Sequence, residues 1–338
     1  MLGDRPCGRQ LTGEQWKLIE TFLPIGEYGP YPERLREQFE GVIWRFRTSS
    51  QWREMPGDFG PWPTVYGRFR VWRDAGVFTA LLEGVIAEAA RQGQTDLSLV
   101  SVDSTTARAH HDAAGMCIGK EVMDALEEAA AEQERARQGG GPPEQNGQDG
   151  SGGPGWEERR HVRRRRKLRL KEALLGRSRG GLTSKVHLAA DRRCRPLSLV
   201  LTAGQAADSP QFVPVLQKVR VPLPVGRPRT RPGAVAADKA YSSRANRSYL
   251  RKRNIKAVIP EKKDQAANRK RKGSRGGRPV SHDAGLYKER NTVERLINKL
   301  KAWRGIATRY DKTPESYLAG LHLRASMIWI NDLLKAAD

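Results

Sequence analysis

The stretch Asp96-Leu97-Ser98-Leu99-Val100-Ser101-Val102-Asp103 divides the chain into two parts of different character. Its leucines and valines form a short apolar run typical of a β-strand, and the run ends on the carboxylate of Asp103. Before this stretch the apolar residues have helical spacing. After it, short apolar runs alternate with helical patterns, so we expect an α/β domain over residues 96–338 behind an all-helical domain over residues 1–95.

The expected α/β core contains a β-hairpin, two further strands and two helices. The hairpin turns at Arg192-Arg193-Cys194-Arg195-Pro196, between two segments rich in apolar residues. The expected ranges are 185–191 and 197–202 for the hairpin, 234–238 and 255–259 for the other strands, and 209–218 and 242–253 for the helices.

Two acids end expected strands of this core. Asp103 ends the first, and Asp238 follows Ala234-Val235-Ala236-Ala237. Ligand sites in α/β sheets form at the carboxyl ends of strands, so the two carboxylates would converge if their strands are neighbours. Hard divalent cations prefer such oxygen ligands. In phosphodiester chemistry, a pair of these cations can activate the attacking oxygen and stabilise the leaving oxygen.

A third acid, Glu294, lies on an expected helix that begins near Tyr287. At 100° per residue it shares an arc of about 60° with three other polar residues. These are Tyr287, Arg290 and Lys301. The arc runs along the edge of the apolar stripe, where a side chain can reach a cleft. Arg290 and Glu294 are also spaced i, i+4, so an ordinary surface ion pair explains them equally well.

The chain is strongly basic. Its formal charge of +23, from 61 Lys and Arg against 38 Asp and Glu, indicates a polyanionic partner, and nucleic acid is the first candidate. No stretch approaches the roughly 18 to 20 apolar residues of a membrane span, and residues 1–10 lack the apolar core of a signal peptide. The three cysteines are too far apart for a disulfide framework or a thiolate zinc site. We therefore expect a cytoplasmic, nucleoid-associated protein with no membrane partner.

The N-terminal helical domain is the first candidate for DNA binding. Thr12 and Gln15 can form a capping box, and further helices are expected at residues 32–48 and 62–75. The last of these helices resembles the recognition helix of a helix-turn-helix reader. Its basic face carries Arg68, Arg70 and Arg73. A plain helical bundle is the alternative, because tryptophans, five of which lie here, are more often core residues than base-stacking platforms.

Two segments interrupt the expected core: an insertion at about residues 117–175 and a basic loop at about residues 261–284. The insertion combines an acidic helix candidate at residues 120–137 with a Gly/Pro/Gln/Asn tract at residues 139–155 that lacks the apolar surface to fold. A basic run follows, which contains Arg163, Arg164, Arg165 and Arg166. Charge runs are usually solvated and disordered, but two of them beside one core favour contact with a phosphate backbone.

Other polar clusters have plainer interpretations than a catalytic or metal site. His110-His111-Asp112 lies on an extended segment, where adjacent side chains point to opposite sides, so no zinc site is expected and a surface or DNA-proximal role is favoured. His187 lies inside a strand and should be packed. Asp191 is expected in the hairpin turn, although it is also the best candidate for a fourth carboxylate. Gly273-Ser274-Arg275-Gly276-Gly277 lacks the Lys-Ser/Thr that follows a nucleotide-binding loop.

Three blocks of the sequence resemble a known family. They are Val102-Asp103-Ser104-Thr105, Ala236-Ala237-Asp238-Lys239-Ala240-Tyr241, and the pattern Tyr-x2-Arg-x3-Glu-x6-Lys from Tyr287 to Lys301. They look like the three catalytic blocks of DDE transposases of bacterial insertion sequences, with the insertion-sequence-five family as the closest branch. Nearly the whole chain is covered, apart from the insertion, which is not typical of that branch.

The resemblance implies a ribonuclease-H-like catalytic domain that binds two Mg²⁺ (or Mn²⁺) ions per active site. The implied ligands are Asp103, Asp238 and Glu294. By the same resemblance Tyr287, Arg290 and Lys301 would hold the transposon end, and Lys239 in the second block is a further DNA-binding candidate.

The function implied is that of a transposase. A homodimer or larger assembly would bind the terminal inverted repeats in double-stranded DNA, cleave there, and join the freed 3′-hydroxyl to target DNA. Two alternatives stay open. One is a structure-selective nuclease that does not join strands. The other is a basic DNA-coating protein whose acids are ordinary surface residues, and its binding would depend steeply on salt but not on Mg²⁺.

Overall fold

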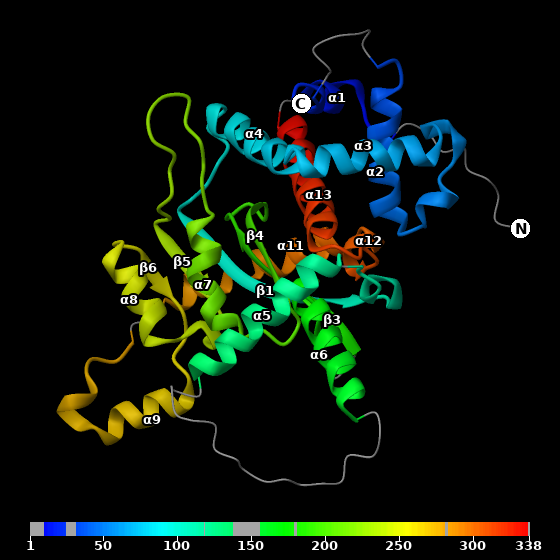
Figure 1. Cartoon of the computed structure of the whole chain (residues 1–338). Helices are drawn as coiled ribbons and strands as arrows, with labels where there is room; N and C mark the ends of the chain where they lie inside the picture. Colours follow the sequence, from blue (N-terminus) through cyan, green and yellow to red (C-terminus); the bar gives the residue numbers. More distant parts are fainter. Residues whose placement is uncertain are drawn as a thin grey trace, which may run out of the picture.

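The computed structural model describes residues 10–24, 32–117, 119–137, 156–178, 181–280 and 283–336. A seven-stranded mixed sheet lies at the centre, with helices packed around it (Figure 1). Its strands are β1 (Leu99–Ala109), β2 (Gly176–Ser178), β3 (Gly181–Ala190), β4 (Pro196–Ala203), β5 (Ala234–Ala237), β6 (Lys256–Val258) and β7 (Thr308–Arg309).

The helices fall into three groups along the chain. Before the sheet come α1 (Gly13–Glu20), α2 (Leu35–Thr48), α3 (Trp62–Asp74) and α4 (Val77–Arg91). The insertion contributes α5 (Lys120–Arg137) and α6 (Trp156–Glu172). The rest are α7 (Asp208–Gln217), α8 (Arg244–Lys252), α9 (Lys263–Arg271), α10 (Ala284–Lys288), α11 (Asn291–Lys301), α12 (Arg304–Ala307) and α13 (Pro314–Lys335). Short 3₁₀ turns join some of them: η1 (Trp52–Glu54), η2 (Gly57–Phe59), η3 (His111–Ala114), η4 (Lys239–Tyr241) and η5 (Gly273–Gly276).

Strand β1 is the centre of the sheet. On one side it pairs antiparallel with β3, which pairs antiparallel with β4; on the other side β5 and then β6 run parallel to it. The order β4-β3-β1-β5-β6, with three antiparallel strands followed by two parallel ones, is that of a ribonuclease-H-like fold. The expected α/β class and the expected β3–β4 hairpin are therefore confirmed. The small strands β2 and β7 extend the sheet beside β3 and β1.

The first strand is longer than the apolar run indicated. Asp103 lies inside β1 and does not end it, because the ladder with β3 continues to Arg108 opposite Thr183. The parallel ladder with β5, in contrast, stops at Val102. The missed half of the strand contains Ser104-Thr105-Thr106, which is polar but includes two β-branched residues that suit an extended backbone.

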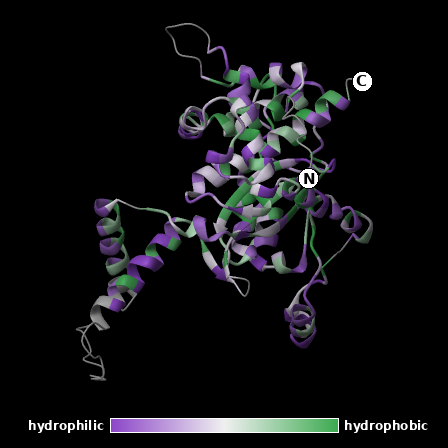
Figure 2. Ribbon diagram, turned by 90° about the vertical axis from the view of Figure 1, so that its right-hand side faces the viewer, coloured by the Kyte–Doolittle hydropathy of each residue, from purple (hydrophilic) through white to green (hydrophobic). Residues whose placement is uncertain are grey.

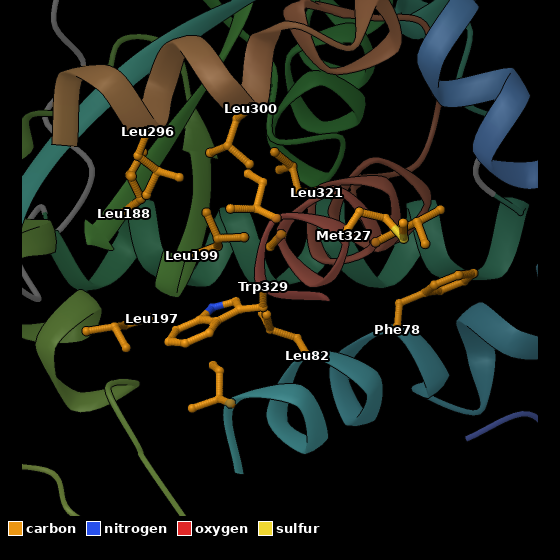
Figure 3. Close-up of a cluster of buried hydrophobic side chains, with 14 of the residues drawn as sticks. Phe78, Leu82, Leu188, Leu197, Leu199, Leu296, Leu300, Leu321, Met327 and Trp329 are labelled. Carbon is orange, nitrogen blue, oxygen red and sulfur yellow. The ribbon is translucent and has the colours of Figure 1, made fainter. Parts of the chain in front are cut away.

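One hydrophobic core joins the N-terminal helices, the sheet and the C-terminal helix α13. In Figure 3 the indole of Trp329 on α13 lies among Leu82 of α4 and Leu197 and Leu199 of β4. Its Nε1–H also donates to the carbonyl of Pro196 at 2.7 Å. Burial of each such large side chain stabilises a fold by about 1.5–3 kcal/mol. Helix α13 is therefore an integral part of both the N-terminal helical region and the sheet.

The N-terminal helices form as the sequence predicts. Thr12 and Gln15 make the capping box of α1, with Thr12 Oγ1 accepting from the Gln15 amide at 3.2 Å and Gln15 Oε1 accepting from the Thr12 amide at 2.8 Å. The tryptophans of this region pack in or against the core, which supports their interpretation as core residues; Trp72 is fully buried. The proposed domain boundary at residue 95 and the DNA-binding role of this unit stay predictions.

The insertion is helical on both sides of residues 138–155, and the expected unfoldable tract lies outside the described residues. The acidic helix is confirmed as α5. The basic run forms the helix α6, unlike most charge runs, which are solvated and disordered. Met123 of α5 and Leu168 of α6 are buried, and Arg165 pairs with Asp124 at 2.7 Å and Glu127 at 3.0 Å. Arginine is also a good helix former. Figure 2 shows these two helices as a largely hydrophilic arm that stands away from the body.

The second basic segment also contains more structure than the expected loop. Helix α9 and turn η5 lie within it, and Arg269 anchors the helix through an ion pair of 2.9 Å with Glu261. Among the described residues, no helix is long and apolar enough to cross a membrane.

Candidate active site

The register of the sheet brings the first two acids together. Val102 of β1 pairs with Ala237, the last residue of β5, in the parallel ladder, and the residue that follows each of them is an acid, Asp103 or Asp238. Asp103 Oδ1 accepts from the Ser104 amide at 2.8 Å, and Asp238 Oδ1 accepts from the Ala240 amide at 2.8 Å. The expected convergence of the two strands is confirmed, and each carboxylate is oriented by a backbone N–H group.

Arg290 connects this pair to the third acid. Its Nη1 donates to Oδ2 of Asp103 at 2.9 Å, and its Nη2 donates to Oε1 of Glu294. The side chains of Asp103 and Arg290 are 21% and 16% exposed, whereas that of Glu294 is 50% exposed. The expected i, i+4 pair therefore exists, but it is more than a surface ion pair because the same guanidinium reaches the sheet. We refer to Asp103, Asp238 and Glu294 as the acid triad.

The helix that carries Glu294 is not continuous from Tyr287. Tyr287 belongs to α10, and Arg290 is the residue before α11. The joint is tightened by i, i+3 hydrogen bonds such as that from the Arg290 amide to the Tyr287 carbonyl at 3.0 Å. The residues of the expected arc nevertheless stay together. The Arg290 guanidinium lies 5.9 Å from the centre of the Tyr287 ring, and Lys301 Nζ donates to the carbonyl of Thr106 on β1 at 3.0 Å.

Burial dominates the electrostatics of Asp103. It raises the pKa of Asp103 above its ordinary value, and the charge of Asp238 acts in the same direction, against the Ser104 amide and Arg290. Burial also lowers the pKa of Lys301. Converging carboxylates need a positive charge nearby, and the Arg290 guanidinium supplies one. An all-oxygen donor set of this kind is chemically suited to a hard divalent cation.

Sequence reasoning missed Asp208, the first residue of α7. Its Oδ1 accepts from Ser104 Oγ at 2.7 Å and from Lys185 Nζ at 3.1 Å. Ser104 follows Asp103 on β1, and successive side chains of a strand point to opposite faces. Asp208 therefore braces β1 from the face opposite the triad. The sequence signal that could have indicated Asp208 is the polar pattern of the two strands. Ser104 on β1 and Lys185 on β3 face the same side of the sheet, and a helix had to cover that side.

His187 is packed in a strand, as expected. Its Nε2 lies 2.8 Å from Thr202 Oγ1, its Nδ1 lies 3.7 Å from Asp208, and burial lowers its pKa to about 4. Asp191 is confirmed as a turn residue and is fully buried. It accepts from the backbone and the guanidinium of Arg195, which closes the β3–β4 hairpin. The Asp191 carboxylate is thus engaged by Arg195 in the hairpin turn.

The expectation that His110 and His111 point to opposite sides is wrong. Strand β1 ends at Ala109 and η3 begins at His111, so the alternation of an extended chain does not apply. The two ring centres are 3.9 Å apart. Asp112 lies against both rings, with Oδ2 at 3.0 Å from His110 Nδ1 and Oδ1 at 3.1 Å from His111 Nε2.

The structure separates the DNA-binding candidates. Lys239 is exposed in η4 next to Asp238, beside the triad. On α3, Arg70 is exposed and Arg68 is half-buried, whereas Arg73 donates to Asp74 and to Ser316 Oγ at 2.8 Å, which ties α3 to α13. On α6, Arg163, Arg164 and Arg166 are exposed, and Arg165 faces α5. Figure 1 shows α3 and α6 in different parts of the molecule.

Comparison with known proteins identifies the family. Residues 94–327 match the family described as Transposase DDE domain, and residues 11–82 match the family described as Putative transposase of IS4/5 family. A putative transposase for insertion sequence element IS6501 of Brucella ovis is 32% identical over 149 residues, which are 44% of this chain and 99% of that protein. A putative transposase for insertion sequence element IS402 of Burkholderia cepacia is 30% identical over 157 residues, which are 45% of this chain and 65% of that protein.

A solved structure was also aligned. The pre-cleavage Mos1 transpososome covers 91% of this chain and 82% of its own, with 10% identity and a TM-score of 0.20. The DDE-domain match spans more than half of the chain, and the Brucella ovis protein is similar over 99% of its own length. The chain therefore belongs to the DDE-domain transposases of insertion sequences.

Proposed function

We propose that this transposase binds the terminal inverted repeats of its insertion sequence, cleaves DNA there, and transfers the cut strand into target DNA. The observation that carries the proposal is the link that Arg290 makes between Asp103 and Glu294, beside Asp238 on the neighbouring strand. Carboxylates from β1, from the residue after β5 and from α11 thus lie in one region, and such carboxylates can hold the cations of a metal-dependent phosphodiester chemistry.

The acid triad would hold two Mg²⁺ or Mn²⁺ ions. When bound, these ions would activate the attacking oxygen and stabilise the leaving oxygen. The chain contributes the placement of the ligands. Backbone N–H groups fix Asp103 and Asp238, and Glu294, with a half-exposed side chain, can turn from Arg290 toward a cation without disturbing the core.

Once its carboxylates are neutralised, Arg290 would be released toward the DNA. A guanidinium can grip a phosphate in a bidentate manner, and aromatic and ammonium groups beside it add contacts to sugar and phosphate. The residues that would hold the transposon end are Tyr287, Arg290, Lys301 and Lys239. Lys239 follows Asp238, Tyr287 lies against Arg290, and Lys301 contacts the strand that carries Asp103, so together they would position the scissile phosphate near the triad.

The basic elements farther from the triad would bind the flanking duplex. Helix α6 exposes Arg163, Arg164 and Arg166, and α3 exposes Arg70. Contacts of this kind neutralise phosphates without reading the base sequence. Joining two transposon ends would require a homodimer or a larger assembly on double-stranded DNA.

The test uses substrates that carry the inverted repeats with and without a target plasmid. Asp238→Asn and Glu294→Gln should each reduce Mg²⁺-dependent cleavage by at least about 1000-fold, because each substitution removes the negative charge of a ligand that positions a cation. DNA affinity should change less than about 3-fold. Full cleavage by either variant would refute the site assignment. Products that are cut but never joined would instead support the nuclease alternative, whereas joined products with short target duplications exclude it.

A further inference from the structure

A second cluster of metal-ligating side chains lies outside the acid triad. The ligand atoms of His110, His111 and Asp112 all lie within 4.8 Å of one another. Around a tetrahedral zinc ion with bonds of about 2.0–2.2 Å, ligand atoms lie about 3.3–3.5 Å apart. Small side-chain rotations therefore suffice to bring two imidazole nitrogens and one carboxylate oxygen onto one ion.

The backbone holds this cluster in place. The His110 amide donates to the carbonyl of Arg309 at 2.8 Å, which continues the pairing of β1 with β7. The His110 ring lies 4.7 Å from the ring of Tyr310. The next three residues belong to η3, whose Ala113 is fully buried. A site that is fixed before the ion arrives loses less conformational entropy on binding.

The donor set selects the kind of metal. Two imidazoles and one carboxylate suit Zn²⁺ and other late first-row divalent ions, whereas Mg²⁺ prefers oxygen ligands alone. Three protein ligands leave a fourth position for water or for a group from another molecule. We propose that His110, His111 and Asp112 form a separate site for a transition metal such as Zn²⁺, distinct from the acid triad.

The position of the site gives it a role. Asp103 lies on β1, and His110 lies just after the end of this strand. Their separation of seven residues corresponds to about 23 Å of extended chain. The cluster lies at the base of the arm formed by α5 and α6, between the end of β1 and the start of α5. A bound ion would join the end of β1 to η3 and so stiffen the segment that leads into α5, the helix with which the basic helix α6 pairs.

The experiment is metal titration of the full-length chain without an affinity tag. The protein is stripped with a chelator and titrated with ZnCl₂ by calorimetry in excess Mg²⁺, so that the triad is occupied. Bound zinc is then counted after gel filtration. The variants are His111→Gln, whose side chain is 82% exposed, and His111→Gln with Asp112→Asn. His161→Ala removes an exposed histidine of α6 and serves as the matched control.

The wild type and the His161 control should bind one equivalent of Zn²⁺ that the double variant does not bind. Zn²⁺ should also slow amide hydrogen exchange at residues 111–114 in the wild type only. Equal zinc binding by the wild type and a folded double variant would overturn the proposal. Absence of a bound equivalent in the wild type would overturn it as well.

Discussion

The guanidinium of Arg290 donates to Oδ2 of Asp103 at 2.9 Å, although the two residues are 187 positions apart in the chain. The contact crosses from the start of α11 to the middle of β1, and the same guanidinium also holds Glu294. The positive charge that balances these acids thus comes from the protein itself. A divalent cation that binds the acids must compete with Arg290, and this competition can be measured.

Arg290→Gln should lower the free energy of unfolding by about 1–3 kcal/mol without metal, because two carboxylates lose a charged hydrogen-bond partner. Added Mg²⁺ should shrink the difference between variant and wild type, because it can supply the missing charge. The measurement is urea unfolding with and without Mg²⁺. Lys288→Gln, at an exposed position of α10, is the control for a lost positive charge. Equal stabilisation of Arg290→Gln and the wild type by Mg²⁺ would contradict the competition.

Asp208→Ala should slow cleavage by about 10- to 100-fold, in the range found when partners behind metal ligands are removed. The loss frees Ser104 Oγ and Lys185 Nζ, so the strand beside Asp103 is less well fixed. Single-turnover cleavage at varied Mg²⁺ should show a higher Mg²⁺ requirement that Asp208→Asn partly restores. Unchanged Mg²⁺ dependence in Asp208→Ala, with a stable fold, would reduce Asp208 to a packing role.

His187 predicts a dependence of stability on pH. Burial lowers its pKa from 6.5 to about 4 in the folded protein, whereas the unfolded chain still protonates near 6.5. The unfolded state then binds more protons between these values, so stability is complete above about pH 6.5 and falls as the pH drops toward 4. At 1.36 kcal/mol per pKa unit the loss is about 3 kcal/mol.

His187→Gln should remove this part of the pH dependence. The measurement is urea unfolding of both proteins at several pH values between 7.5 and 4.5. The gap between variant and wild type should be largest at neutral pH and should narrow in acid. His322, whose pKa is also lowered to about 4 by burial, is present in both proteins and cancels in the comparison. A gap that is constant with pH would show that His187 has the same pKa in the folded and the unfolded state.

Arg163→Gln with Arg166→Gln should weaken DNA binding and make it less sensitive to salt. Each phosphate contact contributes about 0.9 to the slope of log K against log salt concentration, so the slope should fall by nearly 2. Affinity should fall alike for specific and random duplexes. The comparison is Arg165→Gln on the same helix, whose guanidinium faces the acids of α5; it should lower the stability of the arm more than it changes the salt slope. An unchanged salt slope in the double variant would show that Arg163 and Arg166 of α6 do not contact the DNA.

Most of the fold could be predicted because its signals are local. The capping box at Thr12, the hairpin turn around Cys194 and the acidic pattern of α5 each lie within a few residues, and each element forms as expected. The placement of Asp103 beside Asp238 could be stated only as a condition. It depends on which strands pair, and that pairing is decided by the packing of the whole sheet.

The errors share a cause in long-range contacts. The basic run of α6 is stabilised as a helix by acids of α5 that lie about 40 residues earlier. Asp208 becomes a neighbour of Ser104 only when α7 covers the sheet, 104 positions away. The rings of His110 and His111 meet because β1 ends at Ala109 and η3 begins at His111, which a local pattern does not show. Charge and periodicity give no information on such pairs, whereas family resemblance pointed to the triad directly.

The packing of α13 has a consequence for how the protein comes into being. Trp329 and its neighbours complete a core that also contains α4 and β4, yet α13 leaves the ribosome after all of these elements. During synthesis the helices that precede the sheet therefore keep an apolar face exposed until α13 has been made. A transcript cut short before α13 would yield chains that cannot close this face, and such chains are prone to aggregation and proteolysis. We therefore expect the acid triad to be held in place only in chains that include α13.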